Sequence, residues 1–525
     1  MKMQARILIL SKKKSQPDAQ FFGRSYRIGR GWGISVLLDA LCIIKVHLII
    51  KKIEKKSFEL YIKGHFIFVI IGKILMIGKS MTGGAPWKHI LFFTFPILAG
   101  ALLQQFYHTA DTIIVGNFAG EAALSAVGTT NTPAFFFLAI AIGFSAGNGV
   151  LIAQDFGAER WNELRKSAST GVLFMLLIGA VCSLAGALIS PWLYRHFLAV
   201  PPEIYEDTVR YFVIYSSGLI FQFAYNSLAS ILRSVGDSAA TLYFLLIASV
   251  VNIVLDLLFV AVLHWKVAGA AAATNISQAL AVVAAWIYML KKYPVFRYKI
   301  TELRWYGKIA ADTVKIGLPI ALQLVFVALG LTFIQRAVNG FGQVMTASFT
   351  VGQRIEMYLH LPCNALQTAL ATFTGQNVGA KRYDRVKQGA WQGVMLSAGL
   401  TLILSAALWF CAGVLPQAFA LSEQAAAYCY AHLKAVALIV IILSLYVPLF
   451  GVFQGTKNSL VPTIVALCAL TLRVIVTYAV KDTAFFGRSI IWWNGLFGFC
   501  LGCTITWSIY LSKRFQKRLQ PLAEH

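Results

Sequence analysis

Twelve apolar stretches, each long enough to cross the hydrocarbon core of a membrane, recur along the chain from Met81 onward. A core about 30 Å thick needs roughly 20 apolar residues per helix, and short polar breaks separate the stretches. They lie near residues 90–117, 129–153, 168–190, 208–231, 239–262, 268–290, 313–338, 346–372, 388–410, 428–452, 460–480 and 489–511. Composition agrees, because 58% of the 525 residues are hydrophobic and only 13% are charged. The sequence therefore predicts an all-α polytopic membrane protein with twelve transmembrane helices.

Residues 1–80 differ from the rest of the chain. They carry 16 Lys plus Arg against 4 Asp plus Glu, and they contain 15 Ile and 12 Lys but no Thr or Asn. Charged residues interrupt their apolar runs, so that neither run makes a clean span. We interpret this stretch as a basic N-terminal extension produced by a misannotated start, with Met81 as the true initiator. A basic membrane-surface segment and one additional helix are the alternatives.

Basic residues fall on alternate loops. One set of loops, together with the C-terminal tail, holds twenty Lys and Arg, whereas the other set holds only Arg195, Lys266, Lys481 and Arg488. Because loops rich in Lys and Arg stay in the cytoplasm, both termini are predicted to be cytoplasmic. We expect a multi-pass protein of a bacterial cytoplasmic (inner) membrane. The formal net charge of +25 then suits anionic membrane lipid, and no soluble basic module indicates a nucleic-acid partner.

The chain contains an internal repeat. Gln154-Asp-Phe-Gly-Ala-Glu-Arg160 recurs as Gln376-Asn-Val-Gly-Ala-Lys-Arg382 at an offset of 222 along the chain. Two shorter echoes, at offsets of 223 and 221, link residues 95–97 with 318–320 and residues 233–238 with 454–459. Six spans per repeat return the chain to the same side, so the two repeats should run parallel. We predict an N-lobe over residues 81–290, a cytoplasmic linker over 291–312, a C-lobe over 313–511 and a tail over 512–525.

Two aspartates in the N-lobe are the main functional candidates, since ionisable residues within membrane spans usually line a cavity. Asp111 lies six residues before Asn117, the predicted exit from its span, and Asp256 lies eight before His264. These separations place the aspartates about 9 and 12 Å below one surface at 1.5 Å per residue. Asn252 lies one helical turn before Asp256 and shares its face. A pair at matched depth could share a proton or Na⁺, although the same residues could simply tie helices together.

At this point the sequence resembles the MATE (multidrug and toxic compound extrusion) family, within it the DinF-like branch. The resemblance covers residues 81–525 and rests on motifs that appear in family order: Asp111-Thr-x-x-Val-Gly116, the duplicated Gln-x-x-Gly-Ala-x-Arg loops, Leu232-Arg-Ser-x-Gly-Asp237, Asn252-x-x-x-Asp256, and Arg354-Ile-Glu356 with Pro362. It implies two six-helix lobes in a V that export amphipathic organic cations by alternating access, in exchange for protons or sodium.

The resemblance also implies roles for individual residues. It assigns coupling-ion binding to Asp111, Asn252 and Asp256, with a hydroxyl from the sixth span that Thr274 matches best and that neighbouring Asn275 could replace. It implies a hinge at Pro96, fifteen residues before Asp111, although a structural kink is the alternative.

The C-lobe offers a weaker candidate, Arg354 with Glu356. These residues are two apart and so face different sides of a helix, which fits a structural ion-pair role as well as a coupling role. Other branches of the family couple through carboxylates in the seventh and tenth spans, where this chain has Gln323 and Lys434. We therefore expect coupling in the N-lobe.

Three functions compete. We predict a secondary-active multidrug exporter whose partners are small-molecule organic cations and membrane lipid, which is not an enzyme and which acts as a monomer. A flippase for lipid-linked saccharides and an intramembrane enzyme are the alternatives. Eight cysteines lie mostly in apolar stretches and imply no disulfide or metal framework. We expect no cofactor beyond the coupling ion, and no metal beyond sodium at Asp111, Asn252 and Asp256.

Overall fold

The structure is a computed structural model that describes residues 80–297, 302–419, 421–484 and 486–520. The chain divides into two units, Met1–Lys73 and Ile74–His525. Nearly all of the predicted N-terminal extension lies outside the described residues, and so do the last five residues of the predicted tail. All features below belong to the second unit.

Seven α-helices build the first half of the described part. They are α3 (Pro86–Ala119), α4 (Glu121–Gly157), α5 (Trp161–Trp192), α6 (Pro202–Ser217), α7 (Leu219–Ser234), α8 (Ser238–Asp256) and α9 (Lys266–Lys292). Helices α6 and α7 form one crossing with a break at Gly218. Two π-helical segments, η1 (Leu193–Phe197) and η2 (Leu257–Val262), extend α5 and α8.

The second half repeats this pattern after a short linker that contains the 3₁₀ turn η3 (Pro294–Phe296). Its helices are α10 (Gly307–Asn339), α11 (Gln343–Gly379), α12 (Tyr383–Cys411), α13 (Glu423–Ser444), α14 (Val447–Gly455), α15 (Leu460–Val480), α16 (Ile490–Leu511) and α17 (Lys513–Arg518). Two further 3₁₀ turns, η5 (Leu415–Phe419) and η6 (Gly487–Ser489), lie between these helices. The predicted linker at 291–312 thus includes the end of α9 and the start of α10.

The predicted twelve-helix class is confirmed. Each of the twelve stretches falls within a helical crossing of the described residues, and those residues form no strand. Ten of the crossings are long and apolar enough to span a membrane by length and composition alone. The other two are the broken crossing at 202–234 and α11, which carries Arg354, Glu356 and His360.

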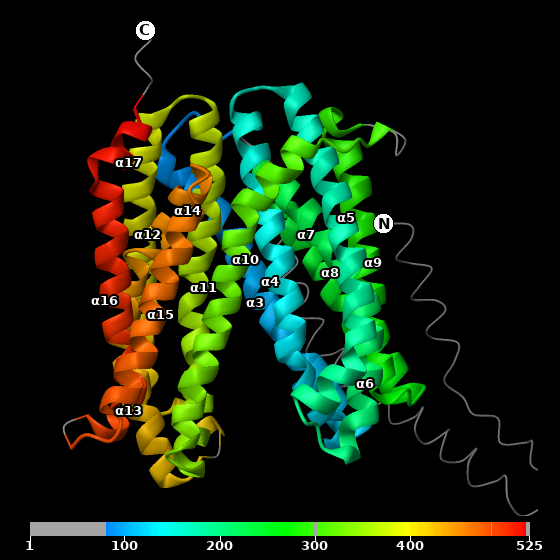
Figure 1. Ribbon diagram of the computed structural model, residues 1–525, viewed down its shortest axis with the longest axis vertical. Coiled ribbons are helices and arrows are strands. Elements are labelled where there is room, and N and C mark those ends of the chain that lie inside the picture. Colours follow the sequence, from blue (N-terminus) through cyan, green and yellow to red (C-terminus); the bar gives the residue numbers. More distant parts are fainter. Residues whose placement is uncertain (1–79, 298–301, 420, 485, 521–525) are drawn as a thin grey trace, which may run out of the picture. The chain divides into compact units, whose positions relative to one another are not determined.

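Figure 1 shows the helices of this unit in two bundles that lie together at one end and diverge toward the other. We call the joined end the basic end; it holds the loops at residues 158–160, 235–237, 293–297, 302–306, 380–382 and 456–459. The opposite end is called the far end. Helices α3 to α9 form the N-lobe, and α10 to α17 form the C-lobe. Helix α4 packs against both α10 and α11 across the seam between the lobes.

Glycines bring α4 and α10 into backbone contact at this seam. A Cβ atom added at Gly147 would lie 2.7 Å from both the Thr313 carbonyl oxygen and the Gly317 nitrogen. A Cβ at Gly143 would lie 2.5 Å from the Ala321 nitrogen. These two glycines therefore allow close packing of α4 on α10, since only hydrogen fits at these positions.

Asp237 explains the role of the Leu232–Asp237 motif at the end of α7. Its buried carboxylate caps α8 by accepting from the Ala240 nitrogen at 3.1 Å. It also accepts from the Tyr288 hydroxyl, the Lys292 ammonium and the Tyr293 hydroxyl at 2.7–2.8 Å. The motif thus ties three elements of the N-lobe together at the basic end.

Each lobe holds the segment that precedes the first helix of the other. The guanidinium of Arg385 in the C-lobe donates to the carbonyl oxygens of Met81, Gly83 and Gly84 at 2.8–3.0 Å, just before α3. In the N-lobe, the Ser169 hydroxyl donates to the Arg304 carbonyl and accepts from the Arg304 nitrogen, just before α10. We call these two contacts the exchanged starts.

Candidate functional site

The predicted acidic pair comes together between α3 and α8, two helices that pack against each other. Asp111 lies on α3, and Asp256 is the last residue of α8. Their carboxyl groups lie close enough to share a hydrogen bond when one of them carries a proton. The side chain of Asp256 is fully buried, and Asn252 on the same face is 1% exposed. The structure therefore brings three of the four predicted N-lobe residues to one place.

These side chains are short of hydrogen-bond partners. Both carboxylate oxygens of Asp256, one oxygen of Asp111 and both polar atoms of the Asn252 amide are buried with no bonded partner among the described residues. Buried polar atoms are nearly always paired, and exceptions call for an explanation. The donor set of carboxylate and amide oxygens fits a proton shared between the acids or a small hard cation such as Na⁺.

The helix changes register directly after the pair. The π-helical segment η2 starts at Leu257, the residue that follows Asp256. Short π-helical segments are uncommon and are frequently found at functional sites, because the extra residue per turn re-aims the neighbouring side chains. No pattern in the sequence predicted this feature.

Two tyrosines lie near the pair and a third stacks on one of them, and none of the three was expected from the sequence. Tyr107 on α3 and Tyr211 on α6 lie within electrostatic range of both aspartates. Tyr215 stacks on Tyr211, with ring centroids 6.2 Å apart and planes 6° from parallel. Of the three, only Tyr107 could have been selected from the sequence, since it lies one helical turn before Asp111. The tyrosines provide hydroxyl and aromatic surface beside the acidic groups.

The fourth predicted residue is bonded within its own helix. The Thr274 hydroxyl donates to the Ala270 carbonyl of α9 at 3.1 Å. The alternative, Asn275, donates to the Ile214 carbonyl of α6. The Thr274 hydrogen bond therefore stays within α9, and the Asn275 hydrogen bond joins α9 to α6. Neither bond is made to a carboxyl group of the acidic pair.

The predicted hinge at Pro96 lies inside α3, which stays helical from Pro86 to Ala119. Pro96 is buried and removes one hydrogen bond from the helix. Pro319 stands in the corresponding place inside α10. A role for Pro96 in bending remains a prediction.

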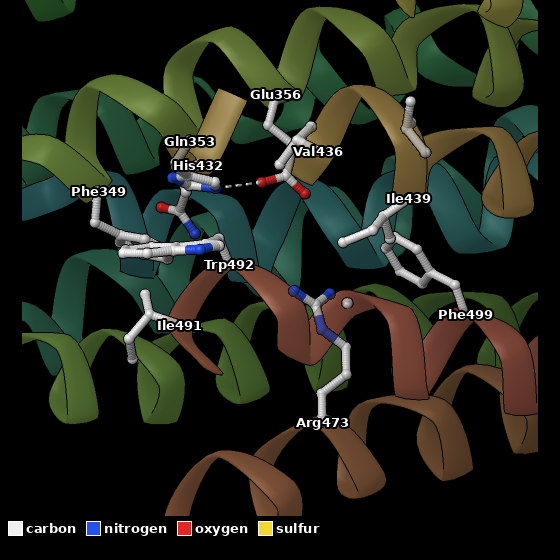
Figure 2. A pocket seen from close by; sticks show the side chains of 12 residues that line it. Phe349, Gln353, Glu356, His432, Val436, Ile439, Arg473, Ile491, Trp492 and Phe499 are labelled. Carbon is white, nitrogen blue, oxygen red and sulfur yellow. Dashed lines mark ion pairs between the residues drawn. The ribbon is translucent and has the colours of Figure 1, made fainter. Parts of the chain in front are cut away.

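Glu356 lies in a separate, largely apolar pocket of the C-lobe, drawn in Figure 2. One of its carboxylate oxygens is 3.5 Å from His360 Nε2, and the other is 3.5 Å from His432 Nε2. His432 comes from α13 and stacks on Phe349 with ring centroids 5.3 Å apart. Arg354 is exposed on α11. The structure thus separates Arg354 from Glu356 and gives Glu356 two histidine neighbours that sequence spacing showed only in part.

Arg473 completes the wall of this pocket (Figure 2). It donates through Nε to Asn494 Oδ1 at 2.8 Å, and its guanidinium lies 5.1 Å from the ring centroid of Phe499. A cation brought into the C-lobe would therefore meet a fixed positive charge beside Glu356, and like charges repel strongly where the dielectric constant is low.

Comparison with known proteins agrees with this architecture. The MatE family model matches the chain twice, over residues 96–258 and 319–479. The two matches begin at Pro96 and Pro319, which are equivalent positions of the internal repeat. Together they cover more than half of the chain, so the chain belongs to the MatE family. It is a membrane transporter and not an enzyme.

Curated relatives come from bacteria. The probable multidrug resistance protein YpnP of Bacillus subtilis (strain 168) is 29% identical over 58% of this chain and 68% of its own length. The multidrug export protein MepA of Staphylococcus saprophyticus is 24% identical over 52% of this chain and 61% of its own length.

Solved structures share the fold. One described as MATE in the bent conformation has a TM-score of 0.78 and 21% sequence identity, and the match covers 83% of this chain and 97% of that one. A second, described as the outward-facing conformation of a multidrug resistance MATE family transporter of the MOP superfamily, also has a TM-score of 0.78, with 84% and 98% coverage.

Proposed function

We propose that this protein is a secondary-active multidrug exporter that moves amphipathic organic cations out of the cell in exchange for protons or sodium. The observation that carries the proposal is the buried acidic pair, Asp111 and Asp256, with its unpaired oxygens among the described residues. Two neighbouring carboxylates in a largely buried site repel each other unless a proton or a cation joins them. The names of relatives such as YpnP and MepA support drug export.

We place the protein in the bacterial cytoplasmic (inner) membrane with its basic end in the cytoplasm. Most of the Lys and Arg residues in the loops and helix ends lie at that end, whereas the far end holds fewer, including Arg195, Lys266, Arg336, Lys481 and Arg488. Positive loops remain in the cytoplasm. The lobes diverge toward the far end (Figure 1), so this conformation corresponds to a carrier open to the outside.

In this scheme the acidic pair exchanges its proton or sodium ion for the exported cation. Asn252 provides an amide next to the pair, and Tyr107 and Tyr211 provide aromatic surface for the organic part of the cation. Binding of an ion and of a drug then compete for the same negative charge. Such competition makes one gradient drive the other.

Transport by purified protein in proteoliposomes tests the proposal. Vesicles would take up or release ethidium, a fluorescent amphipathic cation, under a proton gradient or a sodium gradient imposed separately. We expect one gradient to drive ethidium movement well above the rate in empty vesicles. Equal rates with and without either gradient would refute ion-coupled export.

A further inference from the structure

We propose that Gln154 and Gln376 are gate residues whose side chains hold the two lobes together at the basic end and release them when the carrier opens to the cytoplasm. This inference rests on the proposed function, because it assumes that the lobes alternate between two arrangements. The two residues occupy the same position in the two copies of the internal repeat. Each reaches from its own lobe into the other.

The two hydrogen bonds are reciprocal. Gln154 Nε2 on α4 donates to the Gly455 carbonyl at the end of α14, at 2.8 Å. Gln376 Nε2 on α11 donates to the Ser234 carbonyl at the end of α7, also at 2.8 Å. The acceptors also correspond to each other, because they lie in the echo that links residues 233–238 with 454–459. One bond thus runs from the N-lobe to the C-lobe, and its counterpart runs back.

The surrounding contact is tight. A Cβ atom added at Gly157 would collide with the Gln376 carbonyl oxygen, and one added at Gly379 would collide with the Gln154 carbonyl oxygen. Side chains of Gln154 and Gln376 are both buried. Backbone therefore meets backbone at this point, and the two amides donate in a place that water does not reach.

A third bond attaches the chain before α3 to the same place. Gln376 Oε1 accepts from the Met81 nitrogen at 2.8 Å, so both ends of this amide are used. The Met81 side chain is 2% exposed and packs in the C-lobe core. Gln376 consequently bonds both to Ser234 of the N-lobe and to the segment that leads into α3, the first N-lobe helix.

Such amide bonds suit a gate that must close firmly and still open. When the lobes part at this end, water can replace the lost partner of each amide and each carbonyl, so a single bond shifts the balance by about tenfold at most. The two reciprocal bonds share no donor or acceptor atom, but they lie in one tight contact, so their effects are coupled and the loss of both exceeds the loss of either. Their loss should move the population toward the form open at the basic end.

Hydrogen exchange measured by mass spectrometry tests this on the full chain in detergent, with no drug and no ion gradient. The variants are Gln154→Met and Gln376→Met, which keep an unbranched side chain of similar length and remove the amide. Gln516→Met is the matched control, because Gln516 Nε2 donates to the Tyr510 carbonyl at 2.7 Å near the basic end but within one lobe.

We expect each gate variant to speed exchange about tenfold at residues 154–160 and 376–382 and to slow it at the far-end turns near residues 120 and 342. The double variant should change the exchange rates at both ends more than either single variant does. Gln516→Met should leave the exchange rates at both ends equal to those of the wild type. If exchange rises at the basic end while the far end stays unchanged, the glutamines only pack locally and the gate assignment is wrong.

Two features keep the test decisive. If a methionine variant fails to fold, Gln154→Asn and Gln376→Asn keep a polar amide on a side chain one methylene shorter, which does not span the same donor–acceptor distance, and they should give the same paired change. The measurement needs no transport, so failure of ethidium export would count against the proposed function and leave the gate result standing.

Discussion

At the residue scale, the chemistry of the N-lobe site follows from what its acids lack. Among the described residues, Asp256 forms no ion pair, whereas Asp155 at the basic end pairs with Arg160 at 2.7 Å. Asp237 similarly contacts Lys292 at 2.8 Å. An acid that is paired with a basic side chain has its charge neutralised within the protein. An acid that faces a second acid can instead bind an exchangeable ion.

Replacing either acid of the pair by its amide should abolish coupled export. Asp111→Asn and Asp256→Asn keep the size of the side chain but cannot titrate or hold a cation as strongly. Ethidium transport driven by an ion gradient should fall at least tenfold, and the elution profile and melting temperature should stay near those of the wild type. Asp482→Asn is the control, since Asp482 is 80% exposed at the far end. Wild-type export by Asp111→Asn would show that the site lies elsewhere.

Glu356→Gln should act differently, because Glu356 is enclosed by two histidines and faces Arg473. The change removes the negative charge that faces Arg473 inside the lobe. We therefore expect a lower melting temperature or slower turnover, with an unchanged number of ions per drug. Glu423→Gln is the control, since Glu423 is exposed in the first turn of α13. Ion stoichiometry measured from reversal potentials decides the matter. Loss of ion coupling in Glu356→Gln with coupling retained in Asp256→Asn would reverse the lobe assignment.

Residues of the acidic pair could be predicted because a carboxylate within an apolar stretch stands out in any sequence. Tyr211 and His432 could not be, because tyrosine and histidine are common near membrane surfaces and gain meaning only from a neighbour far away in the chain. The split between Arg354 and Glu356 followed from helical spacing, but His432, the second histidine beside Glu356, comes from α13 and could not be predicted.

At the element scale, the approach of α4 to α10 depends on the absence of side chains. Gly147→Ala places a methyl group against the backbone of the neighbouring helix, so the two helices must move apart. Overpacking of this kind costs about 1–3 kcal/mol, and we expect the melting temperature in detergent to fall by several degrees.

Gly128→Ala is the matched control on the same helix. Nothing lies within 4 Å of a Cβ at Gly128, and alanine is favoured over glycine within a helix by roughly 0.5–1 kcal/mol. Its melting temperature should therefore stay equal or rise slightly. Equal melting temperatures for the Gly147→Ala variant and the wild type would mean that the seam tolerates a wider spacing.

Helix number and order were predictable because a membrane fixes the minimum length of an apolar span. The break at Gly218 and the π-helical segments η1 and η2 were not, since a change in helical register leaves the apolar pattern of the sequence intact. Of these departures, η2 places Asp256 at the end of a regular helix, so it matters more for the site than for the fold.

At the scale of the whole molecule, the exchanged starts join the lobes by contacts between segments far apart in the described chain. Arg385 alone holds three backbone carbonyls of the segment before α3. A planar guanidinium with five donors can make such a fork, whereas a lysine ammonium is a single point of donation.

Arg385→Leu should therefore release residues 81–84 more than Arg385→Lys does. We expect hydrogen exchange at Thr82 to Lys88 to rise in the order wild type, Arg385→Lys, Arg385→Leu, and the melting temperature to fall in the same order. Arg514→Leu is the control, because Arg514 is an exposed arginine of the same lobe. Identical exchange in the lysine and leucine variants would show that the fork geometry contributes nothing.

The two lobes themselves could be predicted from the repeat, whose nearly constant offset places equivalent motifs in both. The repeat could not reveal which lobe covers which start, because self-similarity describes each half and not the contacts between the halves. Gln154 and Gln376 illustrate this, since their shared motif was evident but their partners across the seam were not.

The exchanged starts also constrain the order of events during synthesis. Residues 81–84 find their partner, Arg385, about 300 residues later in the chain. At roughly 5–20 residues per second the ribosome needs about 15–60 s to supply that partner. The N-lobe helices can therefore insert before residues 81–84 form their hydrogen bonds with Arg385. Among the segments of this unit, one of the earliest to leave the ribosome is among the last to be fixed.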